Sequence, residues 1–331
     1  MHRQRVLSGV QPTGKIHLGN YVGALSLWAD NQYRYDSFFC VVDLHALTIP
    51  EAVDPTRLRV KTRETAALYI AAGVDPARSV VFVQSAVTAH AELAWILNCV
   101  SPLGWLERMT QYKTKAARQE SVSIGLLDYP VLQAADILLY QADLVPVGED
   151  QRQHIELTRD IAGRFHRIFG PAFTLPEPLI RSSGARIMGL DDPTAKMSKS
   201  IGEVKPGHAI GLTDSPDEIR RVIMRAATDS GADLRFDTAG PGVLNLLTIY
   251  EVLSGEPREK VEAEFEGRGY GHLKRVVTDR VIATLEPVQQ RYRELMADPA
   301  TLEALLADGT DRARPIADAT LTTVKRLTGL G

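Results

Sequence analysis

Short apolar segments alternate with a helical segment in the N-terminal half of the chain, and this alternation limits the possible folds more than any other feature. We expect strands over three short apolar segments, residues 5–8, 37–43 and 79–84. Between the last two, residues 57–73 repeat apolar side chains at helical spacing, preceded by Asp54 as a cap and by a proline at the first helical position. Strand, helix and strand in this order predict the α/β class with a Rossmann-like, doubly wound parallel sheet. Ligands of such sheets bind beyond the carboxyl ends of the strands.

A change of pattern near residue 200 predicts a second domain. Ser215 and Glu218 form a capping box around a proline, and apolar residues follow at helical spacing. Residues 276–296 and 301–306 also have the pattern of amphipathic helices, and we expect no strand in this part. We therefore expect two domains: a Rossmann-fold catalytic domain over residues 1–200 and an all-helical domain over residues 201–331. The C-terminal helix is free to pack back on the first domain.

The composition is that of an ordinary globular protein and argues against several functional classes. The 331 residues are 44% hydrophobic and 24% charged with a net charge of -3, so contact with nucleic acid needs a local basic patch. Cys40 and Cys99 lie far apart and outside any C-x-x-C pattern, which argues against disulfides and cysteine-held metals. We find no secretory signal and no apolar run of roughly 18 residues, so we expect a cytoplasmic protein without a membrane span.

The segment SGVQPTGKIHLGN over residues 8–20, the first loop, follows the first expected strand and opens a helix. Its glycines permit a tight turn, and Gly19 lets the backbone come close to a ligand. Free N–H groups at the helix start, with His17 and Asn20 beside them, suit a nucleotide phosphate. Two alternatives remain. One is a turn that only connects strand to helix, and the other is the Walker A loop of an ATPase, in which Ile16 replaces the magnesium-binding Ser or Thr.

The segment KMSKS over residues 196–200, the second motif, follows an exposed turn at residues 191–194. Its two lysines and two hydroxyls could close over a triphosphate and neutralise its charge, whereas a solvated basic loop is the alternative. The two loops together resemble the class I aminoacyl-tRNA synthetases. HLGN at residues 17–20 resembles the HIGH motif of that class, and KMSKS matches its second motif letter for letter.

Other segments, spread over most of the chain, resemble the tryptophanyl-tRNA synthetases within that class. They are SGVQPTG (8–14), HLGNYVGAL (17–25), ERMTQYK (107–113), YPVLQAADILLY (129–140), VPVGEDQ (145–151) and GARIM (184–188). The resemblance implies activation of L-tryptophan with ATP and its transfer to tRNA(Trp), with magnesium carried on the phosphates. It also implies a homodimer and an anticodon-binding helical domain. A tyrosyl-tRNA synthetase and a non-catalytic relative that still binds tryptophan remain as alternatives.

The segment over residues 129–140 is a nearly all-apolar helix with one carboxylate in its middle. Four polar side chains share one face of this helix: Tyr129, Gln133, Asp136 and Tyr140. Because burying an unpaired charge is costly, Asp136 should serve either a structural ion pair or a ligand. Indole offers one N–H donor and no acceptor, and the resemblance assigns Asp136 to the indole nitrogen. Gln133 stands where many family members have Met, at a position expected to line the same pocket.

The resemblance also implies the remaining site residues. ATP is assigned to Gln11, Pro12, Thr13, His17, Gly19, Asn20, Gly148, Glu149, Asp150, Ile187, Lys196, Met197, Ser198, Lys199 and Ser200. Within this set residues 148–150 should reach the ribose, and Ile187 and Met197 the adenine. Tryptophan is assigned to Asp136, Tyr129, Gln133 and Gln151. The catalytic candidates are Lys196, Lys199, Lys115 and Gln11, with the lysines on the departing pyrophosphate.

No acidic cluster has the pattern of a dedicated metal site, so we expect none. Two basic groups could contact tRNA, although a solvated charged face is the alternative for each. They are Arg108, Lys113, Lys115 and Arg118, and Arg220, Arg221 and Arg225.

Overall fold

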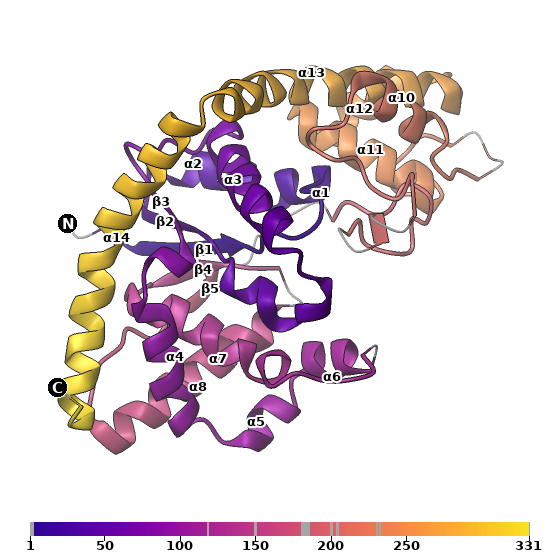
Figure 1. Ribbon diagram of the computed structural model, residues 1–331. Helices are drawn as coiled ribbons and strands as arrows, with labels where there is room; N and C mark the ends of the chain where they lie inside the picture. Colours follow the sequence, from indigo (N-terminus) through magenta and orange to yellow (C-terminus); the bar gives the residue numbers. More distant parts are fainter. Residues whose placement is uncertain are drawn as a thin grey trace.

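A five-stranded parallel sheet forms the centre of the protein, as the computed structural model shows (Figure 1). The structure describes residues 3–117, 119–148, 151–179, 186–198, 201–202, 205–229, 231 and 233–330. The strands are β1 (Arg5–Val10), β2 (Asp36–Val41), β3 (Val80–Val83), β4 (Leu144–Pro146) and β5 (Glu177–Leu179). Their order, β3-β2-β1-β4-β5, is that of a doubly wound sheet, so the predicted fold class is confirmed. The chain reverses its direction of winding between β1 and β4, where a ligand site is expected.

The strands are buried on both faces, which explains their continuous apolar sequences. In β2, Phe38 and Cys40 belong to the core on one face of the sheet, while Phe39 and Val41 belong to the core on the other. The register pairs Leu7 of β1 with Phe38 and brings equivalent side chains of neighbouring strands into one layer. The sheet therefore separates two apolar layers that the helices cover.

Helices cover both faces of the sheet (Figure 1). The first group contains α1 (Leu18–Asn20), the π-helical η1 (Tyr21–Leu25), α2 (Ser26–Asn31) and α3 (Pro55–Ala71). The second contains α4 (Ala89–Val100), α5 (Leu103–Glu107), α6 (Thr110–Ala116), α7 (Ile124–Leu139) and α8 (Arg152–Phe169). Short 3-10 turns are η2 (Leu44–Thr48), η3 (Pro50–Ala52) and η4 (Gln84–Ala86). The first group lies above the sheet in Figure 1 and the second below it.

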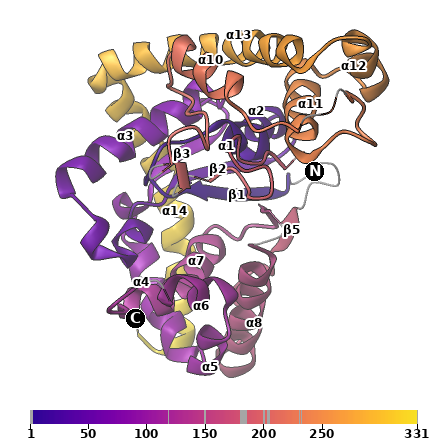
Figure 2. The same ribbon diagram turned by 90° about the vertical axis from the view of Figure 1, so that its right-hand side faces the viewer.

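The C-terminal third is helical in the part that the structure describes. It contains α10 (Pro216–Met224), α11 (Pro241–Ser254), α12 (Arg258–Phe265), α13 (Tyr270–Ala297) and α14 (Pro299–Thr328). We call α10 to α13 the helical unit; Figure 2 shows α13 running across the top of the molecule above α11. α13 also packs against α3, and α14 then descends along β3, α4 and α7. The last helix therefore lies with the sheet, and the boundary at residue 200 stays a prediction.

Helix ends follow the predicted capping signals. Asp54 accepts hydrogen bonds from the backbone N–H groups of Thr56 and Arg57, at 2.9 and 3.1 Å, at the start of α3. Ser215 and Glu218 form the expected capping box of α10. The helix predicted over residues 301–306 proved to be only the first part of the much longer α14. No helix in the described part of the chain is long and apolar enough to cross a membrane.

Candidate active site

A cavity of about 420 Å³, the site cavity, lies where the winding of the sheet reverses. Its walls include the end of β1, the segment that follows β4, and the inner face of α7. The lining residues that the sequence singled out are Gln11, Lys115, Tyr129, Gln133, Asp136, Gly148 and Gln151. All four tryptophan candidates and two catalytic candidates are therefore brought to one cavity.

Asp136 is the central charged group of this cavity, although only 3% of the residue is exposed. Its Oδ1 accepts hydrogen bonds from Nε2 of Gln84 and from Nδ1 of His90, both at 2.6 Å. Its Oδ2 lies 2.8 Å from Nε2 of His45. Burial by itself would raise the pKa of Asp136, but the hydrogen bonds from His45 and His90 hold it below the ordinary carboxyl range. The carboxylate is therefore ionised, and it lines the cavity while three polar side chains bind it; its contact with a ligand stays a prediction.

The three partners of Asp136 were not identified from the sequence; they are His45, Gln84 and His90. They follow the carboxyl ends of two neighbouring strands: His45 lies in η2 after β2, and Gln84 begins η4 after β3. His90 lies in the first turn of α4. Isolated polar residues after buried parallel strands were the available signal, because the carboxyl ends of such strands meet at one edge of the sheet.

Tyr129 and Lys115 form a second wall of the site cavity. The Lys115 Nζ lies 4.6 Å from the centre of the Tyr129 ring, in the geometry of a cation–π contact. Burial lowers the pKa of Lys115 and raises that of Tyr129 to about 12. The Tyr129 hydroxyl lies 3.0 Å from Nε2 of His154. This wall therefore offers one cation and one neutral phenol to a ligand.

The first loop begins at the site cavity and leads away from it. Gln11 lines the cavity, where its Nε2 donates a hydrogen bond to the backbone carbonyl of His45 at 2.7 Å. Further along, Gly14 has a φ of 65°, a left-handed conformation that favours glycine. The other ATP candidates of this loop, Pro12, Thr13, His17, Gly19 and Asn20, are all described and are not among the residues lining the cavity.

The start of the helix after the first loop is organised by Asn20. Its Oδ1 accepts the backbone N–H of His17 at 3.2 Å. The imidazole of His17 is buried, and a Cβ at Gly19 would lie 3.1 Å from its Nδ1. His17 also lines a second hollow of about 750 Å³ together with Ser198. The first loop therefore meets the second motif at this hollow.

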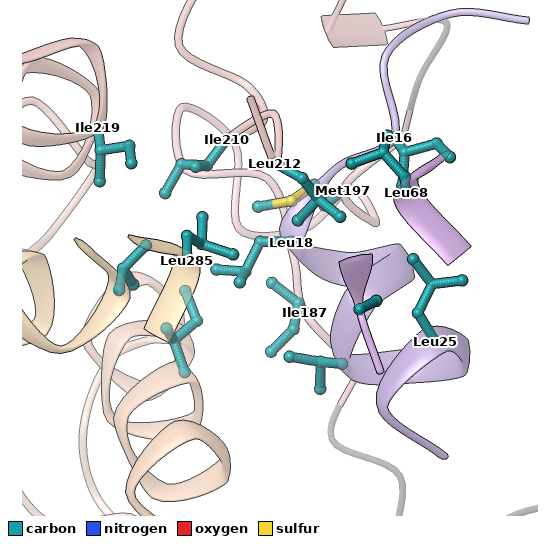
Figure 3. Packing of buried hydrophobic residues seen from close by; sticks show 14 of the residues in the cluster. Ile16, Leu18, Leu25, Leu68, Ile187, Met197, Ile210, Leu212, Ile219 and Leu285 are labelled. Carbon is teal, nitrogen blue, oxygen red and sulfur yellow. The ribbon is translucent and has the colours of Figure 1, made fainter. Parts of the chain in front are cut away.

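The described part of the second motif packs into the protein. Lys196 pairs with Met188 in an isolated antiparallel bridge, and the Met197 N–H donates to the carbonyl of Ile187 at 3.1 Å. Both adenine candidates, Ile187 and Met197, are buried in the same apolar cluster as Leu18 (Figure 3). In this conformation they link the first loop to the second motif by packing.

The bridge between Met188 and Lys196 closes residues 188–196 into a hairpin. Asn245 on α11 connects the helical unit to this hairpin. Its Oδ1 accepts the N–H of Met188 at 2.9 Å, and its Nδ2 donates to the carbonyl of the same residue at 3.1 Å. On the other side of the hairpin, His208 lies between Asp191 and the carbonyl of Lys196, at 2.6 and 3.2 Å. Asn245 of the helical unit and His208, which precedes that unit in the chain, therefore both bind the backbone next to the second motif.

Several predicted residues lie outside the described part of the chain. These are Glu149, Asp150, Lys199 and Ser200 of the ATP set, and Arg118 of the basic set. Of the described ATP candidates, four line one of the two hollows. Gln11 and Gly148 line the site cavity, whereas His17 and Ser198 line the second hollow. The structure thus gathers the predicted tryptophan residues in one cavity and distributes the predicted ATP residues more widely.

The chain is similar to known proteins along nearly its whole length. The family model for class I tRNA synthetases (W and Y) matches residues 1–286. A tryptophan–tRNA ligase from Thermosynechococcus vestitus is 56% identical, over 97% of this chain and 98% of that protein. A tryptophanyl-tRNA synthetase from Mycoplasma pneumoniae has a similar structure, with a TM-score of 0.91, 36% identity, and coverage of 99% and 98% of the two chains. One from Campylobacter jejuni, complexed with ADP and tryptophan, has a TM-score of 0.85, 36% identity, and coverage of 99% and 100%.

Proposed function

The chain belongs to the class I tRNA synthetases of the tryptophan and tyrosine type, and we infer that within this family it is a tryptophan–tRNA ligase. In this reaction the carboxylate of tryptophan attacks the α-phosphorus of ATP, and pyrophosphate leaves. The tryptophanyl group then passes from the adenylate to the ribose at the 3′ end of tRNA(Trp). No protein nucleophile is needed, so the site contributes positioning and neutralisation of charge.

The unused acceptor capacity of Asp136 is the observation that carries this assignment. An ionised carboxylate has about four lone-pair sites for hydrogen bonds. Gln84 and His90 occupy those of Oδ1, and His45 occupies one of Oδ2. One site on Oδ2 is left, on a carboxylate that lines the cavity. A ligand with a single N–H donor and no acceptor, such as indole, matches this remaining site.

The other walls of the site cavity suit the two ends of an amino acid and its activating nucleotide. We propose that Tyr129 and Gln151 bind the amino and carboxylate groups of tryptophan, next to the cation of Lys115. Gln11 and Gly148 lie in the same cavity, at the strand ends where a nucleotide would enter. The buried tryptophan pocket and the nucleotide would then meet at Lys115.

We propose that the rest of ATP binds along the first loop and the second motif, with the ribose on residues 148–150. The residues proposed for the phosphates and adenine are Pro12, Thr13, His17, Gly19, Asn20, Ile187, Lys196, Met197, Ser198, Lys199 and Ser200. Lys196 and Lys199 would stabilise the departing pyrophosphate. Because Ile187 and Met197 are buried in this conformation, binding of adenine requires movement of the hairpin that Asn245 holds.

Magnesium, in this proposal, enters on the phosphates of ATP. Phosphate and water oxygens are the ligands that this ion prefers, and it needs few protein ligands. The described residues contain no group of three or more His, Cys, Asp or Glu side chains placed to hold a metal ion. The protein's contribution would be the cations of Lys115, Lys196 and Lys199 around the phosphates.

We propose that two copies of the chain associate through an exposed apolar surface on the second group of helices. Trp95 on α4, Leu103 on α5 and Ile124 on α7 are 71%, 58% and 79% exposed. Both α4 and α5 contact α7, and large exposed apolar side chains on neighbouring helices are typical of a protein interface. Light scattering on the purified protein should give twice the mass of one chain. Trp95→Glu should reduce the measured mass toward that of one chain. Met224→Glu, on the distant α10, should leave the measured mass unchanged.

The tRNA would bind to surfaces that expose basic side chains. Arg108 ends α5, Lys113 lies on α6, and Arg220, Arg221 and Arg225 lie at α10; all are exposed. We propose that these groups contact the phosphate backbone, which would make the affinity for tRNA dependent on salt concentration. The helical unit would read the anticodon.

Amino-acid-dependent exchange between ATP and pyrophosphate tests the proposed function. Tryptophan should support exchange, and tyrosine, phenylalanine or no amino acid should not. Exchange with tyrosine would show that the pocket around Asp136 takes a phenol. Tryptophan binding without exchange would indicate a non-catalytic relative, and ATP hydrolysis without dependence on an amino acid would indicate an ATPase. Charging of tRNA(Trp) then tests the second step.

A further inference from the structure

His90 connects the ligand-binding carboxylate to a buried phenol. Its side chain is fully buried, and its two ring nitrogens make one contact each. Nδ1 lies 2.6 Å from Oδ1 of Asp136, and Nε2 lies 2.8 Å from the hydroxyl of Tyr140. No step of the proposed reaction uses either His90 or Tyr140.

The neighbours of His90 determine where its proton lies. Burial, with Cys40 and Asp136 nearby, raises the pKa of Tyr140 far above its ordinary value, so the phenol keeps its proton. The Tyr140 hydroxyl can then donate to Nε2 of His90, which places the imidazole proton on Nδ1. Nδ1–H donates to the ionised Asp136, and every donor in this series meets an acceptor.

The terminal torsion of a carboxylate is broad and roughly two-fold, so its hydrogen-bond partners determine how the two oxygens are oriented. The ring of His90 lies beside two aromatic rings. It lies 6.0 Å from that of Phe82 and 5.5 Å from that of Tyr140, measured between centroids. Together with Gln84, His90 fills the acceptor sites of Oδ1, so that Oδ2 is the oxygen with capacity for a ligand.

We propose that His90 is a positioning residue for specificity: by binding Oδ1 of Asp136 it directs Oδ2 toward the indole N–H of tryptophan. This inference rests on the proposed function, because it requires that Asp136 accept the indole hydrogen bond. Without the Nδ1 donor, only Gln84 and His45 hold the carboxylate, and Oδ1 gains a vacant acceptor site that competes for the ligand. Selection for an N–H group should then weaken even where the pocket keeps its shape.

The test compares tryptophan with β-(3-benzothienyl)alanine, in which sulfur replaces the indole N–H. The ratio of kcat/KM for the two substrates in pyrophosphate exchange measures selection for that single group. A site built around a hydrogen bond rejects an analogue that lacks the donor, and we expect a wild-type ratio of roughly 10²-fold or more. A general loss of packing lowers both values and leaves the ratio unchanged.

Two variants of matched size separate the donor from the packing. His90→Asn carries an amide nitrogen close to the position of Nδ1 and should keep the ratio within about threefold of wild type. His90→Leu fills a similar volume without a donor, and its ratio should fall by about tenfold or more, with KM for ATP nearly unchanged. Equal losses for the two substrates in His90→Leu would overturn the proposal.

His90→Gln keeps the test decisive if His90→Leu does not fold. Its amide lies nearer the position of Nε2, so the ratio of kcat/KM for tryptophan to that for the analogue should fall in His90→Gln, whereas it is retained in His90→Asn. Equal ratios in these two variants would overturn the proposal. Asp136→Asn distinguishes a failure of the proposed function. If that variant leaves the ratio unchanged, Asp136 does not bind the indole and the pocket assignment itself is wrong.

Discussion

Replacement of Asp136 by Asn removes the charge at the centre of the site and keeps its shape. Gln84 and His90 both donate to the Oδ1 position, so the amide oxygen of the variant should take that place. Its NH₂ group then faces the cavity, where it meets the indole N–H as a second donor. Removal of the whole side chain would be less informative, because three buried donors would lose their acceptor and destabilise the fold.

The expected loss follows from one hydrogen bond to a charged group. Such a bond contributes about 1.5–3 kcal/mol, and each 1.36 kcal/mol corresponds to about a tenfold change in rate. We therefore expect kcat/KM for tryptophan to fall roughly 10- to 150-fold. KM for ATP should stay within about threefold of wild type, because the nucleotide is assigned to the first loop and the second motif.

Pyrophosphate exchange, with tryptophan and ATP varied separately, measures both effects. Asp128→Asn is a matched control: Asp128 lies on the same helix, α7, and bonds to Asn98 at 3.1 Å outside the residues that line the cavity. It should leave kcat/KM for tryptophan nearly unchanged. Wild-type tryptophan kinetics in Asp136→Asn would refute the reasoning, as would a loss that appears equally in Asp128→Asn.

Three further predictions concern stability and coupling. Gly309→Ala would place a Cβ 1.8 Å from a carbonyl oxygen of β3, so urea unfolding should show a loss of about 1–3 kcal/mol or more, whereas Gly271→Ala, with its nearest neighbour at 3.9 Å, should show none. Asn245→Ala removes both bonds that hold the hairpin before the second motif; because this hairpin has to move to admit adenine, KM for ATP should fall, whereas KM for tryptophan should stay nearly unchanged. The folded pKa of Asp136 is below its unfolded value near 3.9, so its stabilisation should be complete above about pH 4 and decline as pH falls further. The stability difference between wild type and Asp136→Asn should therefore be constant from about pH 5 to 7 and shrink in more acidic urea titrations.

Local signals predicted the elements whose stability is local. The cap at Asp54 and the capping box at Ser215 mark the starts of α3 and α10, because their side chains bond to N–H groups two or three residues away. The helix α14 was underestimated for the opposite reason. Gly309 and Pro315 interrupt the helical pattern, yet α14 continues through both because its inner side packs against β3 and α4. Gly309 in particular reflects close approach to β3, which a sequence window cannot contain.

In the candidate site, too, the sequence identified the residue with a local signal and missed the residues that only the fold brings to it. Asp136 stood out from the sequence because one carboxylate in an apolar helix has to be paired or to bind a ligand. Its partners His45, Gln84 and His90 are 91, 52 and 46 residues away in the chain, and only the parallel pairing of β1, β2 and β3 brings them to it. Each is a polar residue that follows a strand, and this position alone does not identify Asp136 as its partner.

This division has a consequence for how the pocket selects its ligand. In the proposed function the residue that contacts the ligand lies on α7, whereas the groups that bind its carboxylate come from α4 and from the turns after β2 and β3. A motif that covers α7 alone therefore contains the carboxylate without the groups that orient it. Replacement of Gln133, which also lies on α7, should change the packing against the ring, whereas replacement of His90 should change the selection of the N–H group. If both replacements act as predicted, the packing of the ring and the selection of the N–H group are encoded in separate parts of the chain.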